Sequence, residues 1–425
     1  MAQPVLAGDL GVKIAHRRLR RGGRGGNNAR TRGRGKVPSR ALSGGRPTLW
    51  RAVRHKPRNS QRLFWGTGPQ RRRWCRDAAE KPMDLPLHLA RSSRRCAPIT
   101  QIRVAVPIRN EAERLEGLLT SLAEAADAVA LPVVLDAVAN NCTDDSAALL
   151  RAFRHPAVTL DLHEITFPDG EASAGRARRL AMDRAARSGA LVMTTDADSV
   201  MDPGWMVAAL RAVEADADLV CGVIEADLGD ILACPSVARI ARIEAPYGAL
   251  VHEIRHCIDR MTGRQPLGEE RPHYVESGAC MAIRADRYRH IGGLPALCSS
   301  EDRALVHLAG THGLAITYSR DMRARVSGRL DGRAAGGMAE CLRSRMQDDD
   351  PLADQAMLTP EFLAMLWQRA RTGMLTAYPD RSLPVGRRLR ASDLEAALPR
   401  LRAFVETMVR PQYADWQRAL GGGAV

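Results

Sequence analysis

The sequence predicts an α/β fold in which a mostly parallel sheet carries helices on both faces, followed by a helical C-terminal segment. Short apolar, β-branched runs alternate with amphipathic helical patterns from residue 99 onward, which is typical of βαβ units. Polar motifs follow three of these runs, and ligands bind beyond the carboxyl ends of the strands in such sheets. The 425 residues are 45% apolar, enough for one large domain or two modest ones.

The helices expected between the strands have recognisable starts and ends. Asn110 is expected to cap the first one, with Glu113 three residues on in the capping-box position and leucines following at helical spacing. A second helix is expected over 175–189 and ends at Gly189. The strands are expected at 102–108, 131–139, 157–165, 190–198 and 217–226.

The N-terminal residues 1–97 differ in composition from the rest. They hold 25 Lys/Arg against 4 Asp/Glu, so a chain of net charge +15 has a mildly acidic body. Too little apolar surface is available there to offset the ordering entropy, and a disordered basic extension is expected. It is either an arm that binds nucleic acid or an anionic surface, or a solvated tail, or upstream sequence with Met83 as the true start.

Several classes of protein are disfavoured. No run approaches the roughly 18 apolar residues of a spanning helix, and the N-terminus has no sustained apolar core of a secretory signal. The nine cysteines are scattered without zinc spacing, which suits reduced thiols in a soluble cytoplasmic protein. No dinucleotide-binding or P-loop glycine pattern occurs.

An Asp-x-Asp pattern occurs three times, at 196/198, 216/218 and 348/350. Only Asp196 and Asp198 directly follow an apolar strand, and residues two apart on an extended segment point to one side. Two carboxylates together with substrate phosphates suit Mg²⁺ or Mn²⁺. The alternative is a helix N-cap before Pro203.

Seven motifs follow one another along residues 99–333. They are PIRNE (107–111), VLDAVANNCTDD (134–145), GRARRLA (175–181), TTDADS (194–199), SGACMAIR (277–284), GGLP (292–295) and SEDRALV (300–306). Their order resembles a family 2 glycosyltransferase of the GT-A fold, and the resemblance implies transfer of a sugar from a nucleotide-diphosphate sugar to a hydroxyl acceptor.

The resemblance also implies roles for individual residues. The loop after the first strand would line the base and ribose, and Asn140 stands where many members have an aspartate. Arg176 and Arg179 could reach the diphosphate, and Asp196 and Asp198 would hold the metal. The donor-binding residues expected in this way are Pro107, Arg109, Asn110, Glu111, Asn140, Arg176, Arg179, Asp196, Ala197, Asp198, Arg329 and Arg333.

Glu301 and Asp302 match the pair that supplies the catalytic base in this family. An inverting transfer needs one carboxylate to take the proton of the acceptor hydroxyl, and Asp302 is expected to do so. The same stretch, Ser-Ser-Glu-Asp, is also a good helix start with a serine cap. Some family members have a metal-binding histidine after the last strand, where this chain offers Arg329 and Arg333.

The resemblance divides the chain into three parts. A basic extension spans 1–97, a transferase domain spans 98–337, and a helical segment spans 338–425. The transferase domain would have a nucleotide-binding half at 98–226 and an acceptor half at 227–337. Two alternatives stay open: a nucleotidyltransferase, and a nucleic-acid-binding protein whose arginine-rich arm precedes a degenerate transferase domain.

Overall fold

The structure is a computed structural model, and its described residues belong to one compact unit, formed by residues 1–16 and 85–425. The second unit, residues 17–84, lies outside the described residues. The structure describes Leu6–Ala7, Val12–Ile14, and residues 97–421 except 267–269, 333, 335, 376–377 and 380–384.

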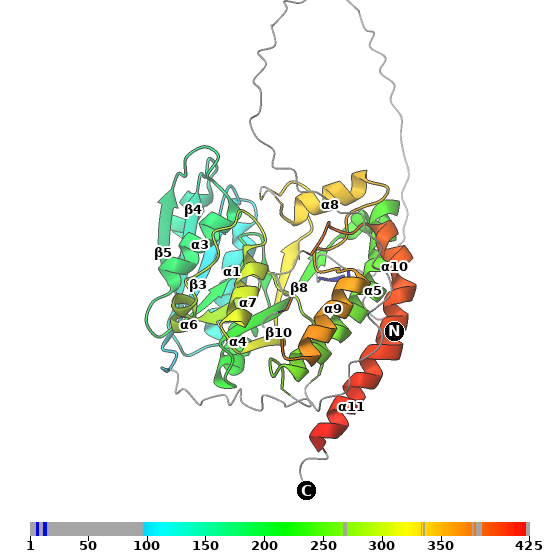
Figure 1. Cartoon of the computed structure of the whole chain (residues 1–425). Helices are drawn as coiled ribbons and strands as arrows, with labels where there is room; N and C mark the ends of the chain where they lie inside the picture. Colours follow the sequence, from blue (N-terminus) through cyan, green and yellow to red (C-terminus); the bar gives the residue numbers. More distant parts are fainter. Residues whose placement is uncertain are drawn as a thin grey trace, which may run out of the picture. The chain divides into compact units, whose positions relative to one another are not determined.

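A mixed sheet forms the centre of the fold (Figure 1). Its order is β5-β4-β3-β6-β9-β8, with β10 pairing along β8. The strands β5, β4, β3 and β6 are parallel, whereas β9 runs antiparallel to both β6 and β8. The strands are β3 (Gln101–Ile108), β4 (Val133–Asn140), β5 (Val158–Ile165), β6 (Ala190–Thr194), β7 (Val200–Met201), β8 (Leu219–Asp227), β9 (Met281–Arg284) and β10 (Ile316–Ser327).

The five expected strands are all present, but the fourth is shorter than expected. β6 ends at Thr194, and residues 195–199 form a turn before β7. Asp196 and Asp198 therefore lie on a turn, and the argument that they share one side of an extended segment is wrong. Buried residues fill every position of β6, so the apolar run ends where the chain leaves the sheet.

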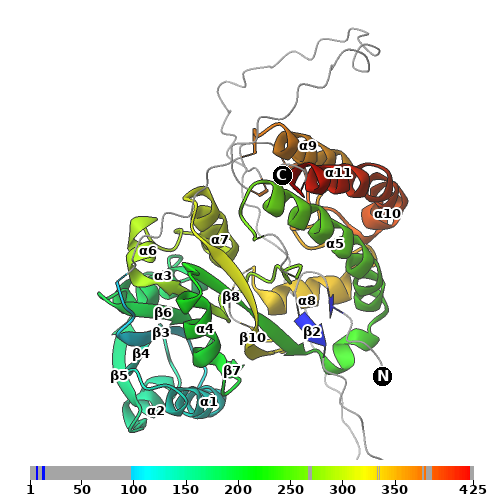
Figure 2. The same ribbon diagram turned by 90° about the horizontal axis from the view of Figure 1, so that it is seen from below.

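Helices cover both faces of the sheet, as expected (Figure 2). Along β3, Ile102, Val104 and Val106 pack into the core under α1 and α4, whereas Ala105 packs into the core under α3, α6 and α7. These helices are α1 (Leu115–Asp127), α2 (Ser146–Ala152), α3 (Ala174–Ala185), α4 (Trp205–Glu214), α6 (Ala285–His290) and α7 (Glu301–Thr311).

The expected cap of the first helix is wrong. α1 begins at Leu115, its N-cap residue is Arg114, and no side chain caps it. Asn110 instead adopts a left-handed backbone conformation with φ 54°. Its Oδ1 accepts a hydrogen bond from the N–H of Thr143 at 2.7 Å, which joins the loops after β3 and β4. Asparagine tolerates this conformation better than most residues, so the local cap signal yields to a tertiary contact.

The helical C-terminal segment is confirmed. Its helices are α8 (Met338–Gln347), α9 (Pro360–Arg371), α10 (Ala391–Phe404), the π-helical turn Val405–Val409 and α11 (Arg410–Gly421). Together with the long helix α5 (Pro235–Met261), most of them enclose a second apolar core that includes Tyr247, Leu363, Trp367 and Leu394. Among the described residues, none of these helices is both long and apolar enough to cross a membrane.

Two short strands belong to the N-terminal arm. β2 (Val12–Ile14) pairs parallel with β8, and β1 (Leu6–Ala7) pairs antiparallel with β2. The rest of residues 1–96 lies outside the described residues, so the expected disorder and the expected nucleic-acid arm stay predictions for that part.

Candidate active site

The candidate site lies where parallel strands end. β3, β4 and β6 run in the same direction, so the residues that follow them meet at one edge of the sheet. The turn after β6 brings Asp196 and Asp198 there, and the loop after β3 brings Glu111. The start of α7 and the turn at Gly278 complete the site.

A buried arginine on α3 connects two of its carboxylates. The guanidinium of Arg178 donates to Glu301 through Nε at 3.0 Å and to Asp196 through Nη2. Its Nη1 donates to the hydroxyl of Thr194 at 2.9 Å and to the carbonyl of Gly278 at 3.0 Å. Burial by itself would lower the pKa of Arg178, but the charges of Asp196 and Glu301 raise it above its ordinary value. Arg178 is therefore a permanent cation inside the site.

Gly278 has no side chain because Arg178 occupies that space. A Cβ on Gly278 would lie 2.7 Å from Cζ of Arg178 and 2.8 Å from its Nε. Such contacts are too short for real atoms, so a larger residue would displace the guanidinium.

A second arginine connects the other two acidic residues. Arg329 follows β10 and forms a two-pronged ion pair with Glu111, in which Nη1 lies 2.8 Å from Oε2. Its Nε lies 3.2 Å from a carboxylate oxygen of Asp198. Bidentate arginine–carboxylate pairs fix both orientation and distance. Arg329 thus lies beside Asp198 and its part in donor binding stays a prediction, whereas Arg333 lies outside the described residues.

Asp302 is held by backbone amides at the start of α7. Its Oδ2 accepts a hydrogen bond from the N–H of Gly278 at 2.9 Å, and its Oδ1 accepts one from Arg303 at 2.8 Å. The helix begins at Glu301 as expected, but the expected serine cap is wrong. Ser300 has a left-handed conformation with φ 59°, and its side chain caps nothing.

The carboxylates of the site outnumber its arginines. Among the ion pairs described, only two arginines, Arg178 and Arg329, face the carboxylates of the site. These carboxylates belong to Glu111, Asp196, Asp198, Glu301 and Asp302. Burial, followed by the charge of Asp196, raises the pKa of Asp198 to about 6, while Arg329 opposes the shift. Burial also raises the pKa of Glu301, against the effect of Arg178. Excess negative charge of this kind favours binding of a cation.

The loops after β3 and β4 are tied together beside these carboxylates. Asp144 accepts hydrogen bonds from the N–H groups of Ala112 and Ser146, both at 3.0 Å. Burial alone would raise the pKa of Asp144, but a hydrogen bond from the side chain of Ser146, together with those from the two N–H groups, lowers it. Asn140 ends β4 and is buried. The expected base-lining residues therefore lie on interlocked loops at the same edge.

The expected diphosphate arginines lie on the outer side of α3. Arg176 pairs with Glu171 and lies over the ring of Phe167, with its Cζ 4.6 Å from the ring centroid. Arg179 pairs with Asp183 at 3.6 Å. Arg109 and Pro107 lie at the end of β3, where Arg109 is exposed. Each of these arginines is accessible, and their part in donor binding stays a prediction.

The sequence analysis missed Arg178, although the motif containing it was recognised. The buried side of α3 consists of Gly175, Ala177, Arg178, Ala181, Met182 and Ala185. An arginine among small apolar residues at helical spacing is the signal that would have found it, since arginine is almost never buried without partners.

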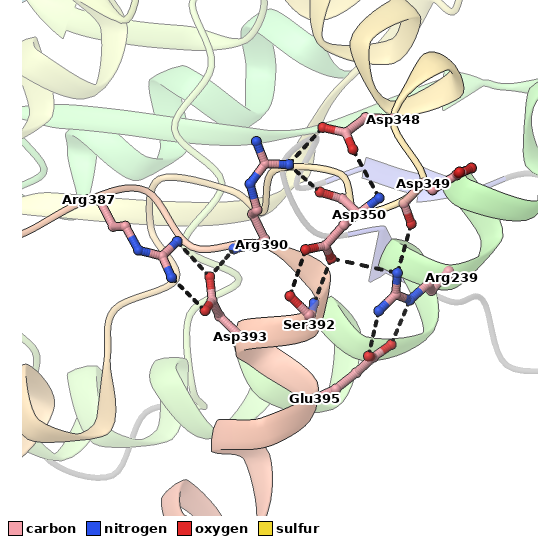
Figure 3. A network of polar contacts seen from close by, with 9 residues as sticks. All are labelled: Arg239, Asp348, Asp349, Asp350, Arg387, Arg390, Ser392, Asp393 and Glu395. Atoms are coloured by element: carbon pink, nitrogen blue, oxygen red, sulfur yellow. Dashed lines mark hydrogen bonds and ion pairs between the residues drawn. The ribbon is translucent and has the colours of Figure 1, made fainter.

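The other two Asp-x-Asp patterns have structural roles. Asp218 accepts hydrogen bonds from Arg287 at 2.9 Å and from the N–H of Ala315 at 3.0 Å. Asp350 accepts hydrogen bonds from the N–H and hydroxyl of Ser392 at the start of α10, and Asp348 pairs with Arg390 (Figure 3). The stretch 348–350 is therefore an accessible loop, as expected, and the side chains of Asp348 and Asp350 also tie it to the start of α10.

A bound metal would fit Asp196 and Asp198 only in part. The two carboxylates interact, because the charge of Asp196 adds to the effect of burial in raising the pKa of Asp198. The side chain of Asp196 is also partly accessible. Each is also paired with an arginine, and no group of three or more His, Cys, Asp or Glu in the described part of the chain has the arrangement of a metal centre. Remaining ligands would have to come from the substrate or water.

The comparison with protein families agrees with this arrangement. The model described as "Glycosyl transferase family 2" matches residues 103–285, which contain Glu111, Arg178, Asp196 and Asp198. The chain therefore carries a family 2 glycosyltransferase domain, as the motifs indicated. The expected enzyme class, a glycosyltransferase, is confirmed for this domain.

The chain also has distant matches among solved structures. S. aureus TarS in complex with UDP-GlcNAc is 15% identical, with 72% of this chain and 73% of that chain covered and a TM-score of 0.39. The mannosyltransferase PcManGT from Pyrobaculum calidifontis, in complex with GDP-Man and Mn²⁺, is 18% identical, with 79% and 86% covered and a TM-score of 0.37. No curated protein matches the chain.

Proposed function

We propose that the protein transfers a sugar from a nucleotide-diphosphate sugar to a hydroxyl acceptor with inversion, using Asp302 as the base. The observation that carries the proposal is the gathering of Asp196, Asp198 and Asp302 at one sheet edge within and beside the family 2 domain. In the transfer, the acceptor oxygen bonds to the anomeric carbon as the bond from that carbon to the diphosphate oxygen breaks. The acceptor proton passes to Asp302, and the bonding electron pair leaves with the diphosphate.

Asp196 and Asp198 are the residues that would hold Mg²⁺ or Mn²⁺. When bound, the ion supplies positive charge that stabilises the departing diphosphate. The excess of carboxylates supports this assignment, because without a bound cation these carboxylates would repel the negatively charged diphosphate of the donor. Arg178 keeps Asp196 in place from the protein side.

The base and ribose would lie against the loops after β3 and β4. Pro107, Arg109, Asn110 and Asn140 are the candidate contacts, and the accessible Arg176 and Arg179 are candidates for the diphosphate. A cytoplasmic location also remains a prediction, supported by free thiols at Cys221, Cys257 and Cys280 in the apolar cores.

The first test is calorimetric titration of the full chain with UDP, GDP, ADP and CDP, with and without Mn²⁺. We expect one nucleotide to bind only when Mn²⁺ is present. Asp198→Asn should weaken that binding at least tenfold, since it removes one ligand charge. A folded protein that binds none of these nucleotides under either condition would contradict the proposed donor class.

Asp350→Asn is the matched control, because Asp350 is the second aspartate of another Asp-x-Asp pattern in the chain. It removes a hydrogen-bonded cap of α10, so it should lower the free energy of unfolding by about 1 kcal/mol and leave nucleotide binding unchanged. Equal losses of nucleotide binding in both variants would mean that Asp198 has no specific role in the metal site.

A further inference from the structure

The start of α7 carries three consecutive charged residues, and each has its own partner. Glu301 accepts a hydrogen bond from Arg178, and Asp302 accepts one from the N–H of Gly278. Both of these partners, Arg178 and Gly278, belong to the transferase domain expected at 98–337. Arg303, the third, faces the C-terminal segment instead. The helix that carries the candidate base is therefore anchored in two parts of the chain.

The anchor in the C-terminal segment is a bidentate ion pair. Nη1 and Nη2 of Arg303 donate to the two carboxylate oxygens of Asp354 at 2.8 and 2.7 Å. Asp354 is buried, with 3% of its surface exposed. Its own N–H donates to Glu244 on α5 at 2.6 Å, and Glu244 also pairs with Arg345 of α8 at 2.7 Å. The loop that presents Asp354 is thus fixed to two further helices.

A second contact from the same loop also holds the helix start. The side-chain amide of Gln355 donates to the hydroxyl of Ser300 at 3.0 Å. Ser300 is the residue with φ 59° that directs the chain into α7. The adjacent residues Asp354 and Gln355 therefore contact the residues immediately before and after Glu301 and Asp302.

We propose that Asp354 is a positioning residue, which acts through Arg303 to hold the start of α7 so that Asp302 stays against Gly278. The catalytic part of this inference rests on the proposed role of Asp302. Fork-like arginine–carboxylate pairs restrict rotation as well as distance. A displacement of about 1 Å in a reacting group can cost about a hundredfold in rate. The C-terminal segment would in this way act on the reaction without touching the substrate.

The test compares Asp354→Asn and Arg303→Lys with the wild-type full chain. Asp354→Asn keeps the shape and loses the charge, whereas Arg303→Lys keeps the charge and loses the fork. Amide hydrogen exchange at Gly278 and over 301–304 is measured first, because it needs no substrate. We expect both variants to raise exchange there at least fivefold, and Arg303→Lys to have the smaller effect.

Release of nucleoside diphosphate from a panel of UDP- and GDP-sugars is measured second. Asp354→Asn should lower kcat ten- to hundredfold, while the Kd for the nucleoside diphosphate with Mn²⁺ changes less than twofold. The double variant Arg303→Lys/Asp354→Asn should be no slower than the slower single variant, since both changes break one pair. Glu361→Gln is the matched control, because it breaks an exposed ion pair with Arg400 in the same segment.

The outcomes separate this inference from the proposed function. Unchanged exchange at Gly278 and 301–304 in both variants overturns the positioning role, whatever the activity. Raised exchange with unchanged kcat also overturns it, because the helix start then moves without consequence for the reaction. If the wild-type chain releases no nucleotide from any donor, the proposed function fails and the exchange result alone decides whether Asp354 holds α7.

Discussion

Arg178 and Glu301 lie 123 positions apart in the sequence, and Nε of the arginine donates to the carboxylate at 3.0 Å in the buried part of the site. The same guanidinium reaches Asp196, so one side chain joins the turn after β6 to the start of α7. Taking a guanidinium and two carboxylates out of water is costly unless they satisfy each other. The position of each group therefore depends on the other two.

Replacing Arg178 by Met should destabilise the protein strongly. The change leaves the buried Glu301 without its main cation, and loss of one partner from a buried pair typically costs about 3–5 kcal/mol. Arg176→Met is the control two residues away, where an exposed ion pair should contribute no more than about 1 kcal/mol. Urea denaturation followed by circular dichroism measures both. Similar stabilities of the two variants would show that Arg178 is not buried among carboxylates.

Replacing Gly278 by Ala should disturb Arg178 from the opposite side. The added Cβ would lie 2.7 Å from Cζ of the arginine, so we expect a loss of about 1–3 kcal/mol from overpacking. Gly204→Ala provides the comparison, because nothing lies within 4 Å of its Cβ position and its φ is −82°. Its free energy of unfolding should change by less than about 0.5 kcal/mol. Equal effects at the two glycines would contradict the close approach at Gly278.

Replacing Asp302 by Asn should abolish transfer and preserve the fold. The asparagine oxygen can still accept the hydrogen bond from Gly278, so the melting temperature should stay within a few degrees of wild type. It cannot take up the acceptor proton, and loss of a general base typically costs about 10²- to 10⁴-fold in rate. The measurement is kcat for sugar transfer, alongside the Kd of the nucleoside diphosphate. Full activity of Asp302→Asn would exclude it as the base.

Glu301→Gln should mainly lower stability, whereas Asp302→Asn should mainly lower the rate of transfer. Glu301 is buried and pairs with Arg178, so its neutral form leaves part of the arginine charge unbalanced. We expect a stability loss of about 1–3 kcal/mol. A variant at Glu301 that keeps full stability and loses only turnover would instead identify Glu301 as the reacting carboxylate.

The contribution of His252 to stability should fall as the pH is lowered from about 6.5 to about 4. Burial, followed by the charges of Arg255 and Arg271, lowers the pKa of His252 from 6.5 to about 4. Between these values the unfolded chain binds a proton that the folded protein does not, so protonation favours unfolding. His256, whose pKa burial also lowers to about 4, contributes in the same direction.

The share of His252 is measured with His252→Gln. Urea denaturation at several pH values should show a shallower loss of stability between pH 6.5 and 4 for this variant than for wild type. His312→Gln is the comparison variant at an exposed histidine. A slope that is the same in wild type and in His252→Gln would show that His252 does not remain neutral in the folded protein.

Much of the fold was predictable because its signals are local. The apolar runs at 102–108 and 190–194 are strands because β-branched and aliphatic residues fill buried parallel positions. The motifs that follow them lie at one edge because parallel strands end together. Asp196 and Asp198 could therefore be singled out from the sequence, whereas Asp302 was expected only through the resemblance to the family.

The tertiary structure decided which partners these residues have. Three arginines lie within four positions on α3, and the packing of that helix alone determines that Arg178 faces inward. Asn110 joins Thr143 rather than capping α1, and the partly exposed Asp350 accepts hydrogen bonds from Ser392 at the start of α10. Each of these contacts links residues distant along the chain. A local pattern records the propensity of a residue, but a buried charge is stable only beside its partners, and their positions follow from the whole fold.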